Sequence, residues 1–402
     1  MNSNKDLPLK GLKILDASTM IAAPWSSTYL ADFGAEVIKI EHPEFGDHAR
    51  GYGKDIEGSS LFWKTLNRNK KCITLNLSKP EGQELFKKLV SRVDVVVENF
   101  RPGTFEKWNL GWDTLLRINP SLILLRTTGF GQDGPYSSRA GFGTVAEGMS
   151  GFTSINGEED GSPTLPGLAL ADGVGSVFGS LSIMIALYER ANNPTREGQY
   201  IDMSLYEPLL RFMEPHLVAY DQLGIIGKRV GNGSVSTAPR NSYQTKDGKW
   251  TALSGASQSI TKNIFKAIGK KELFEDEKFS TNQARLKNVK ELDTLIGGWI
   301  KERNLSEVLQ VFDDHGAVIG PMYDVSQLHE DPHFIHRETF ITVKDEEFGE
   351  MRVPNVVAKF SRTPGAVKSL GANLGEHNDE IYYGLLALSE EEVKELKHNK
   401  II

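Results

Sequence analysis

The first half of the chain alternates short apolar runs, rich in valine, isoleucine and leucine, with longer segments of mixed polarity. Apolar runs without polar alternation are typical of strands covered on both faces, and helices between such strands predict a parallel sheet. Strands are predicted at 12–16, 37–41, 72–77, 94–98 and 121–125. Helices are predicted at 22–33, ended by Gly34, and at 84–93, after a capping-box pattern at 78–81. The fold class is therefore α/β.

The second half has a different pattern. Residues 224–239 are rich in glycine and serine and lack periodicity, which is typical of a linker or exposed loop. Beyond it we expect a hairpin at 242–253, helices at 259–268 and 289–301, and a C-terminal helix opened by a capping box at 389–392. The predicted organisation is a large domain at 1–200, a linker at 201–230, a small domain at 231–325, and a return segment at 326–402.

The longest apolar run, 174–188, carries no charge and ends at Glu189 and Arg190. A membrane-spanning helix needs about 20 residues, so this run predicts a buried core helix. The N-terminal residues are polar and lack the apolar core of a signal peptide. We therefore expect no membrane association.

The amino-acid composition limits which binding partners and which cellular compartment we expect. The 46 basic and 53 acidic residues give a formal net charge of −7, which argues against general nucleic-acid binding. Cys72 is the single cysteine, so an intrachain disulfide is impossible, and a reducing cytoplasm is the expected location. His329, His333 and His336 lie close together, but Pro332 interrupts them, and we expect no metal site.

A dinucleotide-binding dehydrogenase is disfavoured. The unit at 12–41 ends in an acid, Glu41, as such a fold requires. Its first strand should be followed by a glycine-rich turn that lets the backbone approach a pyrophosphate. The segment 17–24 contains no glycine.

Several segments, in their order and spacing, resemble the class III CoA-transferase family, which includes formyl-CoA:oxalate and carnitine CoA-transferases and is also described as CaiB/BaiF-like. The resemblance extends from Gly11 to about Leu396, and its carriers are 30–41, 67–71, 97–103, 129–135, 171–172, 198–204 and 374–377. It implies a Rossmann-like large domain built from both chain ends, a smaller α+β domain from the middle, and an interlocked homodimer. It also implies an enzyme that moves CoA from an acyl-CoA donor to a carboxylic acid, with no permanently bound cofactor.

Asp172 is the candidate catalytic residue. It precedes the apolar run at 174–188, where an aspartate commonly caps a helix. By resemblance it matches the aspartate that becomes acylated in this family, forming an anhydride and then an aspartyl-CoA thioester. The two roles are compatible, because a helix N-terminus favours the ionised carboxylate that a nucleophile needs.

The resemblance also implies a CoA site. The positions that match CoA contacts are Met20, Ile21, Ala22, His42, Leu75, Asn99, Phe100, Arg101 and Lys107. We add Arg139, which follows the glycine loop at 129–135, and note Arg68, Lys70 and Lys71 before a strand as further cations suited to phosphate. His42 is a departure, since one branch has arginine there. Candidates for the acceptor and oxyanion sites are Glu147, Gly255 and Gln258.

Two alternatives stay open. The α-methylacyl-CoA racemases share this fold but need two opposed proton carriers. In them a histidine follows the Arg-Ala-Gly segment, where this chain has Phe142, and a glutamate is expected near Gln258. Both replacements favour the transferase. A CoA-binding paralogue without activity is the second alternative, and the presence of Asp172 weighs against it. The donor and acceptor acids are not specified by the sequence.

Overall fold

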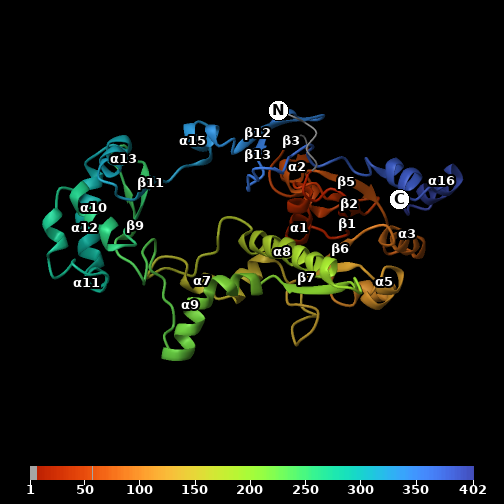
Figure 1. Cartoon of the computed structure of the whole chain (residues 1–402), viewed down its shortest axis with the longest axis horizontal. Coiled ribbons are helices and arrows are strands. Elements are labelled where there is room, and N and C mark those ends of the chain that lie inside the picture. Colours follow the sequence, from red (N-terminus) through yellow and green to blue (C-terminus); the bar gives the residue numbers. More distant parts are fainter. Residues whose placement is uncertain (1–6, 57) are drawn as a thin grey trace. The chain divides into compact units, whose positions relative to one another are not determined.

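The computed structural model describes residues 7–56 and 58–402. It divides into two compact units (Figure 1). The first unit contains the chain up to Phe152, then Leu165–Gly224 and Glu338–Ile402. The second contains Thr153–Thr164 and Ile225–Arg337. The predicted linker at 201–230 differs from this division, because most of it forms a strand, β8 (Gln199–Ser204), and a helix, α9 (Glu207–Leu223).

A six-stranded parallel sheet forms the centre of the first unit. Its strand order is β5-β2-β1-β6-β7-β8. The bounds of the first five strands in chain order are Lys13–Asp16 (β1), Glu36–Glu41 (β2), Lys70–Thr74 (β5), Val95–Glu98 (β6) and Ile123–Thr128 (β7). In register, Leu15 lies opposite Ile38 on one side and Val96 on the other. The predicted α/β class with a parallel sheet is confirmed, and each predicted strand corresponds to an observed one.

The edge strand β8 was not predicted as a strand. It pairs in parallel with β7, for example Leu125 with Ile201. Its first residues, Gln199 and Tyr200, are exposed. The strand therefore lacks the continuous apolar run that marks the others, because an edge strand is buried along part of its length only.

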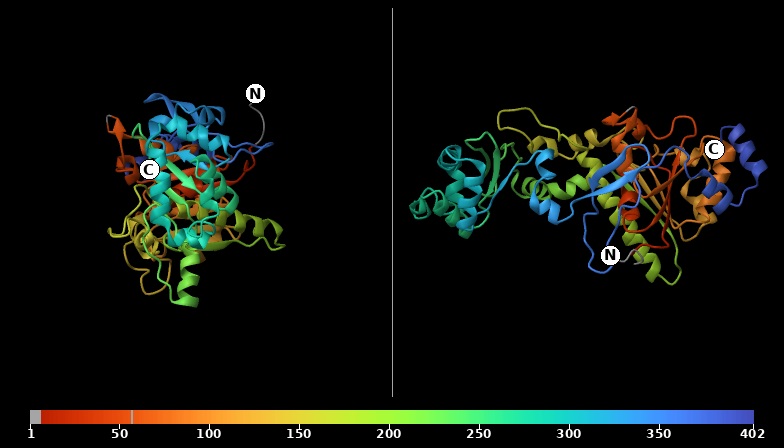
Figure 2. Two further views of the ribbon diagram at one scale, coloured as in Figure 1. Left: turned by 90° about the vertical axis from the view of Figure 1, so that its left-hand side faces the viewer. Right: turned by 90° about the horizontal axis from the view of Figure 1, so that it is seen from above.

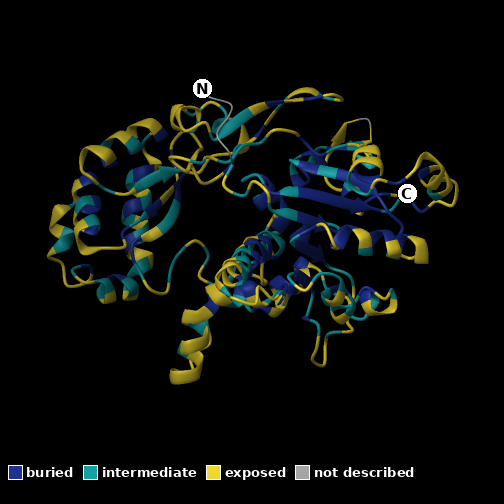
Figure 3. Cartoon of the chain, turned by 45° about the vertical axis from the view of Figure 1, so that its right-hand side comes forward, coloured by how far each residue is buried: buried dark blue, intermediate teal, exposed yellow. Residues whose placement is uncertain are grey.

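Helices cover both faces of this sheet, and its strands other than β8 are almost entirely buried (Figure 3). Successive residues of a strand point to opposite faces. Ile14 therefore packs with α1 (Ala22–Ala31) and α8 (Leu170–Asn192), whereas Leu15 packs with α3 (Pro80–Val90) and α16 (Glu390–His398). Each face thus has its own apolar core.

Two helix starts test the predicted capping boxes. At α16 the Ser389 hydroxyl oxygen accepts from the Glu392 N–H, and the Ser389 N–H donates to the Glu392 carboxylate, as predicted. At α3 the prediction was wrong, because the Ser78 hydroxyl donates to Asn76 and the helix begins at Pro80 without a side-chain cap. Proline at the first position has no N–H to satisfy, which reduces the need for a cap.

The remaining elements of the first unit are short. The helices are Leu61–Leu66 (α2), Thr104–Lys107 (α4), Trp112–Ile118 (α5), Gly143–Met149 (α6) and Phe152–Ile155 (α7, which crosses into the second unit), with a 3-10 turn at His48–Gly51 (η1) and a π-helical turn at Glu380–Leu385 (η3). The strands are Asp55–Ile56 (β3), Ser59–Ser60 (β4), Phe340–Asp345 (β12) and Gly349–Pro354 (β13).

The C-terminal segment returns to the large sheet. The Cys72 N–H donates to Nδ1 of His377, the Thr74 N–H donates to Asn378, and the Tyr382 hydroxyl donates to the Thr74 carbonyl oxygen. These bonds connect the segment at 377–382 to the edge strand β5, which lies about 300 positions earlier in the chain. The first unit is therefore built from both ends of the chain.

The second unit has its own core. Strands β9 (Arg240–Gln244) and β10 (Trp250–Ser254) form the predicted antiparallel hairpin, joined by β11 (Ile319–Pro321). Helices gather around this small sheet (Figures 1 and 2). They are Gln258–Ala267 (α10), Asn282–Lys287 (α11), Val289–Lys301 (α12) and Leu305–Asp314 (α13), with a 3-10 turn at Lys271–Phe274 (η2). Two short helices, Val325–Leu328 (α14) and Pro332–His336 (α15), follow β11, and Figure 1 shows α15 apart from this sheet.

Helix α8 is longer than the apolar run at 174–188 suggested. Its 23 residues are long and apolar enough to cross a membrane by length and composition, which by itself is weak evidence for such a span. Its inner face is packed against α1: a Cβ atom at Gly179 would overlap the Ser26 side chain, and the Ser180 hydroxyl donates to the Ser26 carbonyl oxygen. The predicted core helix is therefore confirmed for its inner face only, because Val177, Leu181, Ile185 and Tyr188 on its other side are exposed.

Candidate active site

The order of the strands reverses between β1 and β6. From β1 the chain passes to β2 and β5 on one side, and it then returns to β6, β7 and β8 on the other. In open parallel sheets a ligand crevice forms at such a reversal, beyond the carboxyl ends of the strands. The segments in that place are 17–22 after β1 and 99–102 after β6, and both contain residues that were predicted to bind CoA.

Hydrogen bonds to two side chains, those of Asn99 and Asp47, hold the segment after β1. The Asn99 side chain accepts from the Thr19 N–H at 2.8 Å and donates to the Thr19 carbonyl oxygen at 2.7 Å. Met20 has a left-handed backbone (φ 66°), and its N–H donates to Asp47. Asp47 in turn forms a fully buried ion pair with Lys39 at 2.9 Å. Asn99 thus fixes this segment with its amide, a role that the resemblance alone did not indicate.

Asp172 lies in the first turn of α8, at the third helical position. Its carboxylate rests against Gly143 of α6, where a side chain would overlap it. No hydrogen bond to this carboxylate is found from residues 7–56 and 58–402, so it does not cap its helix. Burial, and then the negative charge of nearby Glu147, raise the pKa of Asp172 to about 6. The group is therefore ionised near neutral pH and not neutralised by a donor.

Glu147 belongs to α6 and is 3% exposed. Its Oε1 atom accepts from the N–H groups of Leu170 and Ala171, at 3.1 and 3.2 Å. Ala169, at the N-cap of α8, has no side-chain acceptor. Glu147 therefore caps α8 from a neighbouring helix and does not line the cavities described below, so its predicted contact with an acceptor stays a prediction.

A cavity of about 260 Å³ opens beside Asp172 at the strand reversal. It brings together most of the predicted site: Met20, Ile21, Ala22, Asn99, Phe100, Arg101, Arg139 and Asp172. Arg101 and Arg139 are exposed, and the Arg139 guanidinium stacks on the Tyr136 ring at 3.8 Å. Phe142 also lines this cavity, at the place where a racemase would need a proton carrier.

A second cavity, of about 380 Å³, shares Thr19 and Phe100 with the first. It contains the predicted residues His42 and Leu75. The His42 ring stacks on Phe45 with a centroid distance of 3.7 Å, and Phe45 is 62% exposed. Burial lowers the pKa of His42, so the ring is neutral at pH 7 and offers an aromatic face more than a charge.

Other predicted residues lie elsewhere. Lys107 is exposed on α4 and lines neither cavity. Gly255 and Gln258 belong to the second unit, where the Gly255 N–H donates to Pro239 and Gln258 donates to Ser280, so their roles stay predictions. Lys70 is fully buried and bonded to Asp16 at 2.9 Å, and it is therefore unavailable to phosphate.

Sequence reasoning missed three contributors to the site. The Thr19 backbone forms two hydrogen bonds with the Asn99 side chain, and Gly143 leaves room for the Asp172 carboxylate. Tyr136, the stacking partner of Arg139, lies in the glycine-rich segment after β7. The glycines at 141 and 143 are a signal for close approach, but the partner of Gly143, 29 positions away, could be identified only in the folded chain. Among the described residues no group of three histidine, cysteine or acidic side chains could hold a metal ion.

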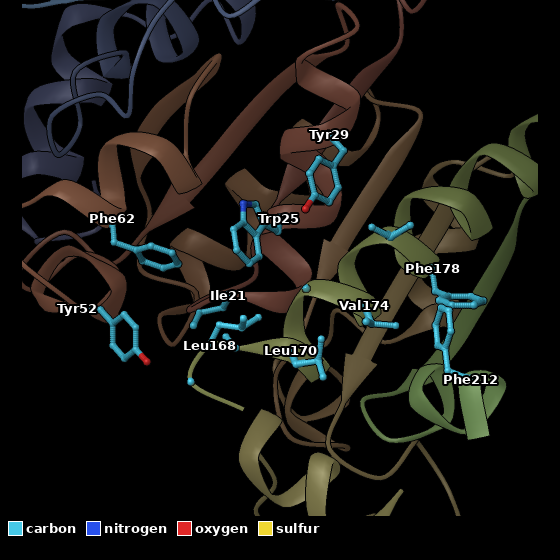
Figure 4. Close-up of a pocket in the computed structure, with 14 residues that line it drawn as sticks. Ile21, Trp25, Tyr29, Tyr52, Phe62, Leu168, Leu170, Val174, Phe178 and Phe212 are labelled. Atoms are coloured by element: carbon cyan, nitrogen blue, oxygen red, sulfur yellow. The ribbon is translucent and has the colours of Figure 1, made fainter. Parts of the chain in front are cut away.

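An apolar cavity of about 640 Å³ lies along the start of α8 and shares Ile21 with the cavity at Asp172. Figure 4 shows aromatic and aliphatic side chains from α1, α2, α8 and α9 arranged around it. Trp25 and Phe62 meet edge to face, and so do Phe178 and Phe212. Its outer part is open, since Val177 and Phe212 are mostly exposed.

Comparison with known proteins bears on this geometry. The model of CoA-transferase family III matches residues 9–378. The chain is 41% identical to succinyl-CoA–D-citramalate CoA-transferase of Chloroflexus aurantiacus over 396 residues, 98% of each protein. It is 38% identical to the beta subunit of succinyl-CoA–L-malate CoA-transferase from the same organism, again over 98% of each. Its structure resembles that of a CaiB/BaiF family protein from Brucella suis, with a TM-score of 0.83, 33% identity, and coverage of 95% of this chain and all of the other.

The expected family is confirmed by these matches, which extend over nearly the whole chain, and the enzyme class follows from it. The chain belongs to CoA-transferase family III.

Proposed function

We propose that this enzyme transfers CoA from an acyl-CoA donor to a carboxylic acid, with Asp172 as the nucleophile. The observation that carries the proposal is the unbonded Asp172 carboxylate, which lines one cavity with Arg101 and Arg139 at the strand reversal. A nucleophilic carboxylate must be ionised and open to the substrate. Two arginines beside it suit a ligand that carries phosphate groups.

In the first half-reaction, an Asp172 oxygen attacks the thioester carbonyl carbon. The carbon–sulfur bond breaks, which leaves a mixed anhydride and the CoA thiolate. The thiolate then attacks the Asp172 carbonyl carbon, the anhydride bond breaks, and the donor acid leaves from an aspartyl-CoA thioester. Division of a difficult exchange into easier steps is the gain from covalent catalysis.

In the second half-reaction, the acceptor carboxylate attacks the aspartyl thioester and releases the thiolate. A new anhydride joins Asp172 to the acceptor. The thiolate attacks the acceptor carbonyl carbon, forms the product acyl-CoA, and returns Asp172 to its carboxylate. No proton is gained or lost in the cycle, which agrees with the absence of ionisable proton carriers at Phe142 and Gln258.

The two adjoining cavities are the proposed CoA site. Its phosphates would contact Arg101 and Arg139, and its adenine would stack on the exposed ring of Phe45. Stacking on an aromatic face does not require charge, so a neutral His42 is compatible with that end of the site. The donor we propose to test first is succinyl-CoA, because the names of both Chloroflexus relatives include it.

We also propose a homodimer. Along α8 a stripe of exposed apolar residues continues outward from the apolar cavity, with a spacing that places them on one helix face: Val177, Leu181, Ile185 and Tyr188, each more than half exposed. A continuous apolar surface of this kind is typical of a protein interface. One relative is named as a subunit of a larger enzyme, so light scattering should be performed on the protein purified alone.

Mass spectrometry after incubation with a panel of acyl-CoA thioesters tests the proposal. We expect hydroxylamine or borohydride to trap an adduct on the peptide that contains Asp172. The variant Asp172→Ala should bind CoA and lose transfer. No adduct with any donor, together with exchange of the α-proton in deuterated water, would show a racemase instead.

A further inference from the structure

Glu147 is a buried acid that the reaction above does not use. It projects from α6 toward the first turn of α8, where its Oε1 atom accepts from the Leu170 and Ala171 N–H groups. The first four N–H groups of a helix have no partner within the helix, and Ala169 offers no side-chain acceptor here. An acid from a second helix therefore binds the Ala171 N–H and shares the Leu170 N–H with the Leu168 carbonyl oxygen, and these are two of the donors that precede Asp172.

The choice of an acid at this place affects Asp172. A carboxylate in the first turn of a helix usually gains from the backbone donors and from the positive end of the helix dipole, and both lower its pKa. Here two donors are bound by Glu147, and its own charge repels that of Asp172. The effect on Asp172 is opposite to the usual one, since burial and Glu147 raise its pKa to about 6.

The other neighbours of Asp172 add no compensating hydrogen bond. Gly143 of α6 touches it without a side chain, and the start of α1 contributes the apolar Ala22 and its N-cap residue Ile21 to the cavity wall. The charged groups that line the same cavity are Arg101, after β6, and Arg139, after β7. Neither guanidinium forms an ion pair with Asp172 within the described chain.

We propose that Glu147 is a positioning residue for Asp172: it fixes the first turn of α8, accepts from donors there, and leaves the Asp172 carboxylate as an unbonded nucleophile. A carboxylate that accepts fewer hydrogen bonds and faces a like charge holds its electron pair less tightly, and it therefore attacks a thioester more readily. This inference rests on the proposed role of Asp172.

The variant Glu147→Gln separates charge from capping. Glutamine keeps a carbonyl oxygen at nearly the same position, so the two bonds to α8 are retained, and the negative charge is lost. We expect the acidic limb of the kcat/KM profile to move to lower pH by about one unit. We also expect kcat at pH 8 to fall several-fold, with KM and the melting temperature nearly unchanged.

Glu207→Gln is the matched control. Glu207 lies in the first turn of α9 and accepts from the Ser204 hydroxyl, and it lines neither of the cavities assigned to CoA. Replacing this acid by an amide at the start of α9 should leave the acidic limb of the kcat/KM profile at the same pH. If Glu147→Gln also leaves the limb in place, Glu147 only caps the helix and the inference is wrong.

A readout without turnover separates this inference from the proposed function. In protein labelled with ¹³C at the aspartate carboxyl carbon, the Asp172 signal is identified by its loss in Asp172→Asn. Its titration midpoint should fall in Glu147→Gln, whether or not any donor acylates the enzyme. An unchanged midpoint overturns the role of Glu147, whereas a shifted midpoint without an adduct overturns the role of Asp172 alone.

Discussion

The Asp172 carboxylate lies against the α-carbon of Gly143, so close that a Cβ atom there would overlap Oδ2 and come within 3.0 Å of Cγ. The backbone of Gly143 has no left-handed φ, so space and not conformation demands glycine at this position. In Gly143→Ala we expect the carboxylate to be displaced and kcat to fall by about 100-fold, because misplacement of a reacting group by about 1 Å has costs of that order.

Gly148→Ala, on the same helix α6, is the control for this variant. A Cβ atom at Gly148 meets no heavy atom within 4 Å. Alanine should be tolerated or should stabilise α6 slightly, since it has the higher helix propensity. Steady-state kinetics and circular dichroism measure both variants, and equal activity of Gly143→Ala and Gly148→Ala would contradict the proposed contact.

Asp172 should also cost stability at the pH where it works. Its folded-state pKa, about 6, lies above the ordinary value of 3.8, so the folded protein holds the proton more tightly than the unfolded chain. The benefit is complete below pH 3.8 and is lost as the pH rises through 6. We therefore expect Asp172→Asn to be more stable than the natural protein at pH 8, by on the order of 2 kcal/mol, and to lose most of that advantage at pH 4.5.

Urea unfolding of both proteins at the two pH values measures this effect. Titrating groups that do not interact with Asp172 contribute equally to the two proteins and cancel in the difference. An advantage of equal size at pH 8 and pH 4.5 would mean that the substitution acts through packing and not through the charge of Asp172.

The two candidate cations for CoA should differ in importance. Arg101 lines the cavity beside Asp172, whereas Lys107 lies on α4 outside both cavities. We expect Arg101→Gln to weaken CoA binding about tenfold, and Lys107→Gln to weaken it less than threefold, since exposed charges interact weakly over distance. Calorimetry at low and high salt measures both, and the reverse order would place the phosphates nearer to α4.

Most of the fold could be predicted from pattern. The five predicted strands are rich in apolar residues, because a strand between two helical layers is buried on both faces. The edge strand β8 could not be predicted in this way, because its exposed first half interrupts the apolar run. The join between the chain ends also escaped it, because bonds such as that of Tyr382 to Thr74 depend on contacts between distant segments and leave no local signal.

Only part of the site could be predicted, again because contacts between distant segments leave no local signal. Residue types that suit CoA, together with a family pattern, identified Asp172 and the segments after β1 and β6. The function of Glu147 could not be read in this way, because an acid that caps another helix 23 positions away looks in sequence like any acid of a short helix. Cations are ambiguous for the same reason, since only the fold separates a buried ion pair from a ligand contact.

Lys70 and Lys71 give the last prediction, because they are adjacent in β5 and point to opposite faces. Lys70 is fully buried and donates to Asp16, Asn67 and the Pro24 carbonyl oxygen, while Lys71 is partly exposed beside Glu36 and Glu380. Burial raises the pKa of Asp16, but the charge of Lys70 helps to hold it near 2. Lys70→Met would therefore leave a poorly compensated buried charge on Asp16. We expect a loss of about 3 kcal/mol in the free energy of unfolding, against less than about 1 kcal/mol for Lys71→Met. Denaturant unfolding at pH 7 measures both. A similar loss in the two variants would show that the ion pair with Asp16 contributes no more than a surface pair, and it would restore Lys70 as a candidate for ligand binding.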